Sequence, residues 1–184
     1  MVAGISLSIL SLVHIHSGNE ISNKALPVIT QIRISSPATP GVVAPYLVPK
    51  HGSFMGSLSI PALNRLLPIY QGTEDSQLSK GVGHFETSAL PGEANNVVLS
   101  GHRDSVFTKF NRLKIGDNLI VATPDGIFTY QIFKFRIVKA DDRTVIVPTP
   151  TAILTLTTCY PFIYIGSAPD RYIVSANLLN ASPK

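Results

Sequence analysis

The chain has 184 residues, of which 45% are apolar and 14% charged, with a formal net charge of +4. This length allows one domain with an ordinary hydrophobic core, and the composition excludes a disordered or highly charged protein. The positive charge is mild, and neither a Lys/Arg run nor an aromatic RNA-binding signature accompanies it, so we expect no nucleic acid partner.

The first segment, residues 1–16, is apolar and nearly uncharged. It is shorter than the roughly 20 residues that span a bilayer, serines interrupt it, and no Lys or Arg precedes it as in a signal peptide. Three interpretations remain: the remnant of a membrane anchor, a weak signal-like segment, or an amphipathic helix packed on the domain. We favour the anchor remnant, and with it membrane attachment through the N-terminus.

The next segment, residues 17–55, is rich in Pro, Ser and Gly and has little apolar periodicity. Such a composition predicts a stalk or a segment that wraps the domain, because it offers too little apolar surface for a second core. We therefore expect the folded domain at residues 56–184.

From residue 56 onward, short apolar or alternating segments recur between turn residues, as is typical of β proteins. We expect about eight strands, at residues 57–60, 67–70, 96–100, 118–122, 127–138, 144–147, 152–159 and 171–178. The turn sequence 123–126, Thr-Pro-Asp-Gly, predicts a hairpin. Helical signals are short, at 76–80 and at 105–113 with Ser105 as N-cap. The domain is thus predicted to be mainly β, a small closed barrel or a sandwich with one or two short helices.

The only cysteine, Cys159, ends an alternating Thr/Leu strand and is followed by Tyr160 and Pro161. Proline cannot continue the strand as a donor, so the thiol is expected at the tip of a stiff element. With no second cysteine, an internal disulfide is impossible. Cys159 is therefore either an inert buried thiol or a nucleophile, and the inert role is the more common one for a free cysteine.

His102 and Arg171 also lie at predicted strand ends, where a rigid scaffold can present side chains to one cleft. Together with Cys159 they supply what acyl transfer needs: a thiolate, a proton-transferring imidazole and a fixed cation beside a developing oxyanion. Taken singly, His102 is more often a surface histidine, and Arg171 more often half of a salt bridge with Asp170 or Asp104. The residues alone leave both interpretations open.

Other groups are weaker candidates. The remaining histidines lack the spacing of a zinc site, the Asp and Glu pairs sit in solvated turns, and no Gly-rich loop has phosphate-binding spacing. We expect no metal and no cofactor.

Three stretches resemble the sortase family: Thr155 to Pro161 (TLTTCYP), Val98 to Asp104 (VLSGHRD) and Arg171 to Val174 (RYIV). The segment 91–96 also resembles the approach to the histidine strand of that family. Order and spacing agree from about residue 56 to residue 179. The residues of these stretches are most similar to those of class D sortases, with class E next.

This resemblance implies an eight-stranded β-barrel transpeptidase, extracytoplasmic and associated with the outer face of the cell membrane. Such an enzyme cleaves an LPxTG-like or LPxTA-like sorting signal of a surface protein after Thr, through a thioester. It then transfers the acyl group to an amine of a peptidoglycan precursor or a pilin. By position, Cys159 would be the nucleophile, His102 the general acid/base, and Arg171 the group that stabilises the oxyanion or orients the substrate.

The same resemblance places an extended peptide in a groove near the thiol. Candidate substrate-binding residues are Thr158, Tyr160, Ile146, Val147, Ile163 and Tyr164. Two other functions stay open: a different cysteine acyl-transfer enzyme of the L,D-transpeptidase kind, and a catalytically silent surface barrel that binds wall or protein ligands. The first of these is disfavoured because residues 157–160 lack the Ser-x-Gly-Cys context of that family.

Overall fold

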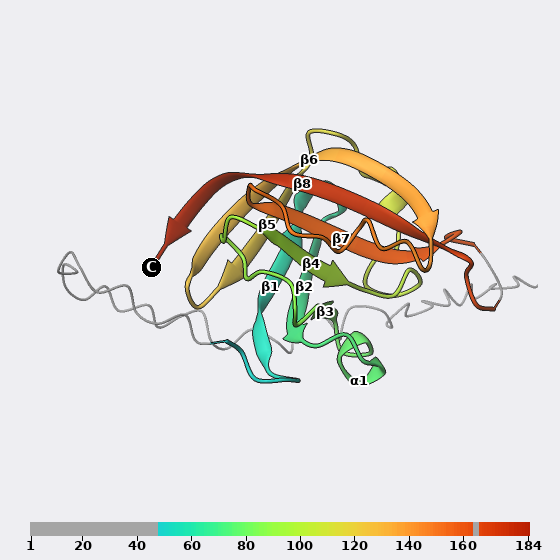
Figure 1. Ribbon diagram of the computed structural model, residues 1–184, viewed down its shortest axis with the longest axis horizontal. Coiled ribbons are helices and arrows are strands. Elements are labelled where there is room, and N and C mark those ends of the chain that lie inside the picture. The colour runs from blue at the N-terminus through green and yellow to red at the C-terminus, as the bar shows by residue number, and fades with distance from the viewer. Residues whose placement is uncertain (1–47, 164–165) are drawn as a thin grey trace, which may run out of the picture. The chain divides into compact units, whose positions relative to one another are not determined.

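The computed structural model describes residues 48–163 and 166–184, and in them eight strands close into a barrel (Figure 1). The strand order around the barrel is β1-β2-β3-β4-β7-β8-β6-β5, closed by antiparallel pairing of β1 with β5. The prediction of a closed eight-stranded barrel is confirmed, and a sandwich is excluded. The strands are β1 (Phe54–Ile60), β2 (Arg65–Gln71), β3 (Val82–His84), β4 (Asn96–Ser100), β5 (Asn118–Thr123), β6 (Gly126–Lys139), β7 (Ile153–Tyr160) and β8 (Asp170–Pro183).

Helices are few and short, as predicted. The described residues contain one α-helical turn, α1 (Asp75–Leu78), and two 3-10 turns, η1 (Pro61–Leu63) and η2 (Phe110–Arg112). The predicted hairpin is present, with β5 antiparallel to β6. The first strand begins at Phe54, two residues before the expected domain start.

The prediction of a strand at residues 144–147 is wrong. The chain turns there because Asp142 Oδ1 accepts hydrogen bonds from the Thr144 backbone N–H (2.7 Å) and hydroxyl (2.6 Å). Such a local side-chain bond competes with strand pairing. The strand that the sequence did not predict is β3, only three residues long, which pairs in parallel with β2.

Of the predicted helix at 105–113, only the 3-10 turn η2 is present, and the residues before it form turns. Lys109 has a left-handed backbone (φ 65°), which interrupts a helix. The guanidinium of Arg65 donates hydrogen bonds to the carbonyls of Ser105 and Val106 and to the Thr108 hydroxyl, and so holds this segment as a turn.

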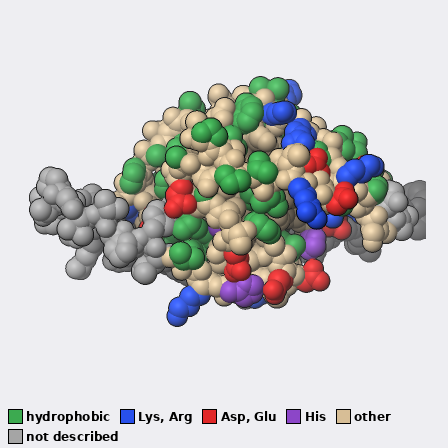
Figure 2. All heavy atoms as spheres, in the orientation of Figure 1, with side chains coloured by type: hydrophobic (Ala, Val, Ile, Leu, Met, Phe, Trp, Pro, Cys, Tyr) green, Lys and Arg blue, Asp and Glu red, His purple; other side chains and the backbone are tan. Residues whose placement is uncertain are grey.

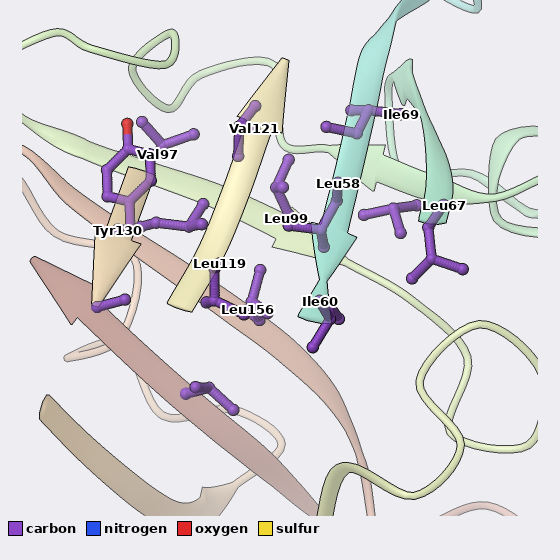
Figure 3. Close-up of a cluster of buried hydrophobic side chains, with 14 of the residues drawn as sticks. Leu58, Ile60, Leu67, Ile69, Val97, Leu99, Leu119, Val121, Tyr130 and Leu156 are labelled. Carbon is purple, nitrogen blue, oxygen red and sulfur yellow. The ribbon is translucent and has the colours of Figure 1, made fainter. Parts of the chain in front are cut away.

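The barrel interior is filled by alternate residues of each strand (Figure 3). In β4, Val97 and Leu99 point into this core, in line with the period of two of a β-strand. Asn96 and Val98 of the same strand are also buried, so β4 is covered on its outer face too. The β6–β7 loop, residues 140–152, lies on this outer face. The Asn96 side chain donates hydrogen bonds to the backbone carbonyls of Val145 and Val147 in this loop.

The topology requires that loop to be long. Both β6 and β7 are antiparallel to β8, so they run in the same direction, and their connection must return along the barrel. In Figure 1 it does so over β4 and β7. A wall is thereby built beside the ends of these strands.

The predicted N-terminal segments lie mostly outside the described residues: all of 1–16, and 17–47 of the 17–55 stretch. Within the described part of the chain, no helix is long and apolar enough to cross a membrane.

His84 forms a buried polar junction between β2, β3 and the following turn. Its Nδ1 lies 2.7 Å from Gln71 Oε1, and its Nε2 lies 2.9 Å from the Ala89 carbonyl oxygen. Burial lowers the pKa of this histidine from its ordinary value of 6.5, and this effect exceeds that of the Ala89 hydrogen bond.

We predict that His84 makes the fold sensitive to acid. The unfolded chain binds a proton on this histidine below about pH 6.5 while the folded chain resists it, so the stability linked to His84 is present above pH 6.5 and lost as the pH falls. The free energy of unfolding, measured with urea from pH 8 to pH 5, should therefore fall less steeply with acid in His84→Gln than in the wild type.

His51 is the matched control, because Glu86 raises its pKa through a 2.8 Å contact. Its contribution is present below pH 6.5 and is lost as the pH rises through its raised pKa. The free energy of unfolding should therefore fall more steeply with acid in His51→Gln than in the wild type. Equal slopes in the wild type and His84→Gln would contradict the prediction.

Candidate active site

Three adjacent strands place the predicted catalytic residues in one row. Cys159 of β7 is the register partner of Arg171 of β8. On the other side, β4 runs parallel to β7 with Ser100 opposite Thr157, so two residues further along each chain bring His102 beside Cys159. Directly paired cross-strand residues have Cβ atoms about 4.5–5.5 Å apart in antiparallel sheets. Strand register thus places Cys159 beside Arg171, and the Gly101 segment that continues from β4 brings His102 to the same cleft.

All three side chains line one cleft of about 340 Å³ on the outer face of the barrel. Its opposite walls come from the α1 region and from the β6–β7 loop, through residues such as Leu78, Phe85 and Ile146. This volume is at the lower end of the range for ligand-binding clefts. Cys159 is partly exposed, so an inert thiol sealed in the core is excluded.

The sequence left open a purely structural role for Arg171 as half of a salt bridge with Asp170, but no such salt bridge is present between these two described residues. Its Nη1 donates to the backbone carbonyls of Asp170 (2.9 Å) and Ala168 (3.2 Å), while the Asp170 carboxylate pairs with Lys139 at 3.0 Å. The guanidinium is thus oriented by backbone oxygens, and within the described residues no carboxylate neutralises it. A charge held in this way can bind a developing oxyanion.

Charged side chains gather at this end of the barrel on the face that Figure 2 shows. Figure 2 shows Lys and Arg mainly on the right-hand half of the view, where β4 and β7 end in Figure 1, with Asp and Glu among them. Two ion pairs lie there, Lys139 with Asp170 and Arg136 with Asp142.

The strands of His102 and Cys159 are joined beyond the end of β4. The Gly101 N–H donates to the Thr157 carbonyl (3.2 Å), and the buried Thr158 hydroxyl donates to the Gly101 carbonyl (2.7 Å). Position 101 has no room for a side chain, because a Cβ there would lie 2.6 Å from Val106 and 2.9 Å from the Phe107 ring. Glycine therefore lets this segment pack closely just before His102.

Arg103, next to His102, reaches the loop between β7 and β8. Its guanidinium donates to the carbonyls of Pro161 (3.0 Å) and Gly166 (3.5 Å). The histidine segment and the loop that follows the cysteine are thereby held together.

Comparison with known proteins shows the family. A family model described as the sortase domain matches residues 58–179. The chain belongs to the sortase family. It is 47% identical over 127 residues to sortase D of Bacillus subtilis strain 168, which covers 68% of this chain and 64% of that relative. The expected similarity to class D sortases is thereby confirmed.

Solved structures of sortases are similar to this chain as well. The chain is similar to a sortase D5 transpeptidase of Clostridium perfringens (29% identity, TM-score 0.65, covering 71% of this chain and 82% of that one). It is also similar to sortase C of Streptococcus pneumoniae (26% identity, TM-score 0.66, covering 74% of each chain). The chain spans less than two thirds of the length of the Bacillus relative.

The predicted substrate-binding residues of this sortase lie in different places. Ile146 lines the cleft, and together with Val147 it also lines a smaller adjoining hollow of about 110 Å³. Both belong to the β6–β7 loop, not to a strand as the sequence suggested. Thr158 borders the cleft, but its hydroxyl is engaged by Gly101.

Tyr160 and Ile163 are placed away from these hollows. The Tyr160 ring packs against Phe162 and Tyr172, at centroid distances of 5.5 and 6.1 Å. Ile163 is 96% exposed in the β7–β8 loop, and Tyr164 lies outside the described residues.

Sequence reasoning missed the rest of the cleft wall. Thr73, Leu78 and Phe85 come from segments around α1 and β3, which carry no motif. It also missed Asn96, whose only sequence signal is its place at the start of the histidine strand. Among residues 48–163 and 166–184, no group of three His, Cys, Asp or Glu side chains is arranged to hold a metal.

We predict that Thr158 stabilises the junction between β7 and the segment that follows β4. In Thr158→Val the shape is kept, but the buried Gly101 carbonyl loses its partner, which should cost about 1–2 kcal/mol of unfolding free energy. Urea denaturation would measure this. The matched control is Thr157→Val, because Thr157 is partly exposed on the cleft side, and its cost should stay within about 0.5 kcal/mol. Equal effects of the two substitutions would count against this role for the Thr158 hydroxyl.

Proposed function

We propose that this sortase is a cysteine transpeptidase of class D that acts on a sorting signal of LPxTG or LPxTA type. The observation that carries the proposal is that Cys159 of β7, its register partner Arg171 of β8 and His102, two residues beyond the end of β4, line one cleft. The family match supports the reaction class.

The first half-reaction is acylation of Cys159. The Sγ thiolate attacks the carbonyl carbon of the signal threonine, and the Arg171 guanidinium stabilises the resulting oxyanion. The C–N bond to the next residue then breaks, and His102 donates a proton to the departing amine. The product is a thioester on Cys159 and a released peptide.

The second half-reaction transfers the acyl group. An acceptor amine gives a proton to His102 as its nitrogen attacks the thioester, and Cys159 leaves as a thiolate. The new amide joins the surface protein to its acceptor. The thioester must outlast attack by water, and walls on both sides of the cleft favour this.

The acceptor is proposed to be an amine of a peptidoglycan precursor or of a pilin. Pilin substrates are named for the Streptococcus sortase C, a structural neighbour. Sortases are in general cell-surface enzymes, and we place this one at the outer face of the membrane with its N-terminal segment toward it.

Loss of the thiol should abolish activity. We expect the wild type to cleave a quenched fluorescent LPxTG or LPxTA peptide and to form a thioester adduct on Cys159 visible by mass spectrometry. Cys159→Ala should do neither, while keeping the circular dichroism spectrum of the wild type. Equal signals from the two proteins would reject the enzyme function and favour a silent binding barrel.

Arg171→Ala should lower kcat/KM for this peptide by about 100-fold or more, as removal of an oxyanion donor does in other enzymes. Arg171→Lys is the control, because it keeps the charge but loses the planar fork of donors, so it should recover only part of the activity. Near-full activity in Arg171→Ala would remove this residue from the mechanism.

A further inference from the structure

The β6–β7 loop, residues 140–152, forms one wall of the cleft without forming a strand or a helix. A wall of this kind needs side-chain contacts to hold it, because it has no ladder of backbone hydrogen bonds. The question is which residues keep Ile146 directed at the cleft.

Asn96 holds the middle of the loop. Its side-chain Nδ2 donates to the backbone carbonyls of Val145 and Val147, both at 3.1 Å. These two carbonyls flank Ile146, so the residue that lines both hollows sits between two fixed points. Asn96 is only 5% exposed, so these bonds are shielded from water.

The orientation of the Asn96 amide follows from its neighbours. The Thr155 hydroxyl donates to Asn96 Oδ1 at 2.8 Å, from the neighbouring strand β7. The opposite orientation would set an amide oxygen against two carbonyl oxygens, which repel it. All three bonds therefore need an amide, and a carboxylate cannot replace it.

The neighbouring residue, Asn95, makes a different set of bonds. Its Oδ1 accepts from the backbone N–H groups of Thr149 (2.9 Å) and Asn96 (2.8 Å). A carboxylate can accept both of these bonds equally well. The two adjacent asparagines therefore differ in whether aspartate can substitute.

We propose that Asn96 is a positioning residue that fixes the β6–β7 loop and so determines selectivity for the apolar residues of the sorting signal. The inference rests on the proposed function, since it assigns the loop as the wall that contacts the substrate. Asn96 acts through Ile146 and does not touch the reacting atoms. Its loss should relax selectivity more than it affects the thiol chemistry.

The test compares Asn96→Asp with Asn95→Asp, which introduce the same charge at adjacent positions. The reference is Ile146→Ala, which shows whether the leucine or the proline of the signal packs on Ile146. Each protein is assayed with an LPxTG-type peptide and with peptides carrying alanine in place of that leucine or proline. Asn96→Ala serves as a second, uncharged variant if Asn96→Asp does not fold.

Asn96→Asp should lower kcat/KM for the parent peptide by about tenfold or more, chiefly through KM, because a displaced wall misaligns the substrate. If Ile146→Ala no longer discriminates between the parent peptide and one of the two alanine peptides, Asn96→Asp should lose discrimination against that same alanine peptide. Asn95→Asp should match the wild type. An Asn96→Asp enzyme that keeps wild-type selectivity, or an Asn95→Asp enzyme that loses it equally, would overturn the proposal.

A second measurement is independent of catalysis. Backbone hydrogen exchange in the 145–152 segment should be accelerated in Asn96→Asp and unchanged in Asn95→Asp, where Thr149 keeps its acceptor. If the wild type cleaves no sorting-signal peptide while this exchange pattern holds, the proposed function fails and the loop-fixing role stands. If exchange is the same in all three proteins, the loop-fixing role fails whatever the activity.

Discussion

The parallel pairing of β4 with β7 is the constraint on which the rest of this structure depends. It aligns the end of the histidine strand with the end of the cysteine strand, and the antiparallel pairing of β7 with β8 then places Arg171 on the far side of Cys159. Beyond the end of β4, the bonds between Gly101 and residues 157 and 158 continue this alignment up to His102. A shift of one residue in either register would turn one of these side chains to the inside of the barrel. The register is protected because Val97, Leu99 and Leu156 are buried in the core on the inner face.

The same strand order explains why the cleft has a loop for a wall. Because β6 and β7 run in the same direction, the connection must travel back along the outside of the sheet, where it covers β4. A strand covered on both faces loses the simple alternation of apolar and polar residues. Asn96 is the buried polar residue of this strand, and it is satisfied by bonds to the loop and to Thr155. A buried amide with all its partners favours one arrangement of the covering loop over others, since any other leaves its donors unpaired.

Most of the barrel could be predicted from the sequence, because seven of its strands are long enough to show their apolar pattern and are bounded by turn residues. The short strand β3 could not, because three residues with a glycine in the centre carry no periodicity. A strand was wrongly predicted at residues 144–147 because their β-branched residues favour one. The hydrogen bonds that Asp142 accepts from Thr144 turn the chain there instead. The placement of His102, Cys159 and Arg171 at strand ends was visible in the sequence. Of their neighbours on the cleft wall, Ile146 was expected, but Leu78 and Phe85 were not, because they carry no motif and lie in the segments around the short strand β3.

The structure separates two kinds of constraint at the cleft. The residues to which the proposed function assigns the reaction sit on or immediately beside paired strands, whose geometry is fixed by backbone hydrogen bonds and by a core on the inner face. The wall that would contact the substrate is a loop fixed by a few side-chain bonds, chiefly those of Asn96 and Asp142. Changes in a loop leave the strand register intact, so the wall can vary in sequence and shape while His102, Cys159 and Arg171 stay in place. If the proposed function holds, a scaffold with this division can change which peptide it accepts by altering loop residues and their few anchors, while the geometry around Cys159 is kept.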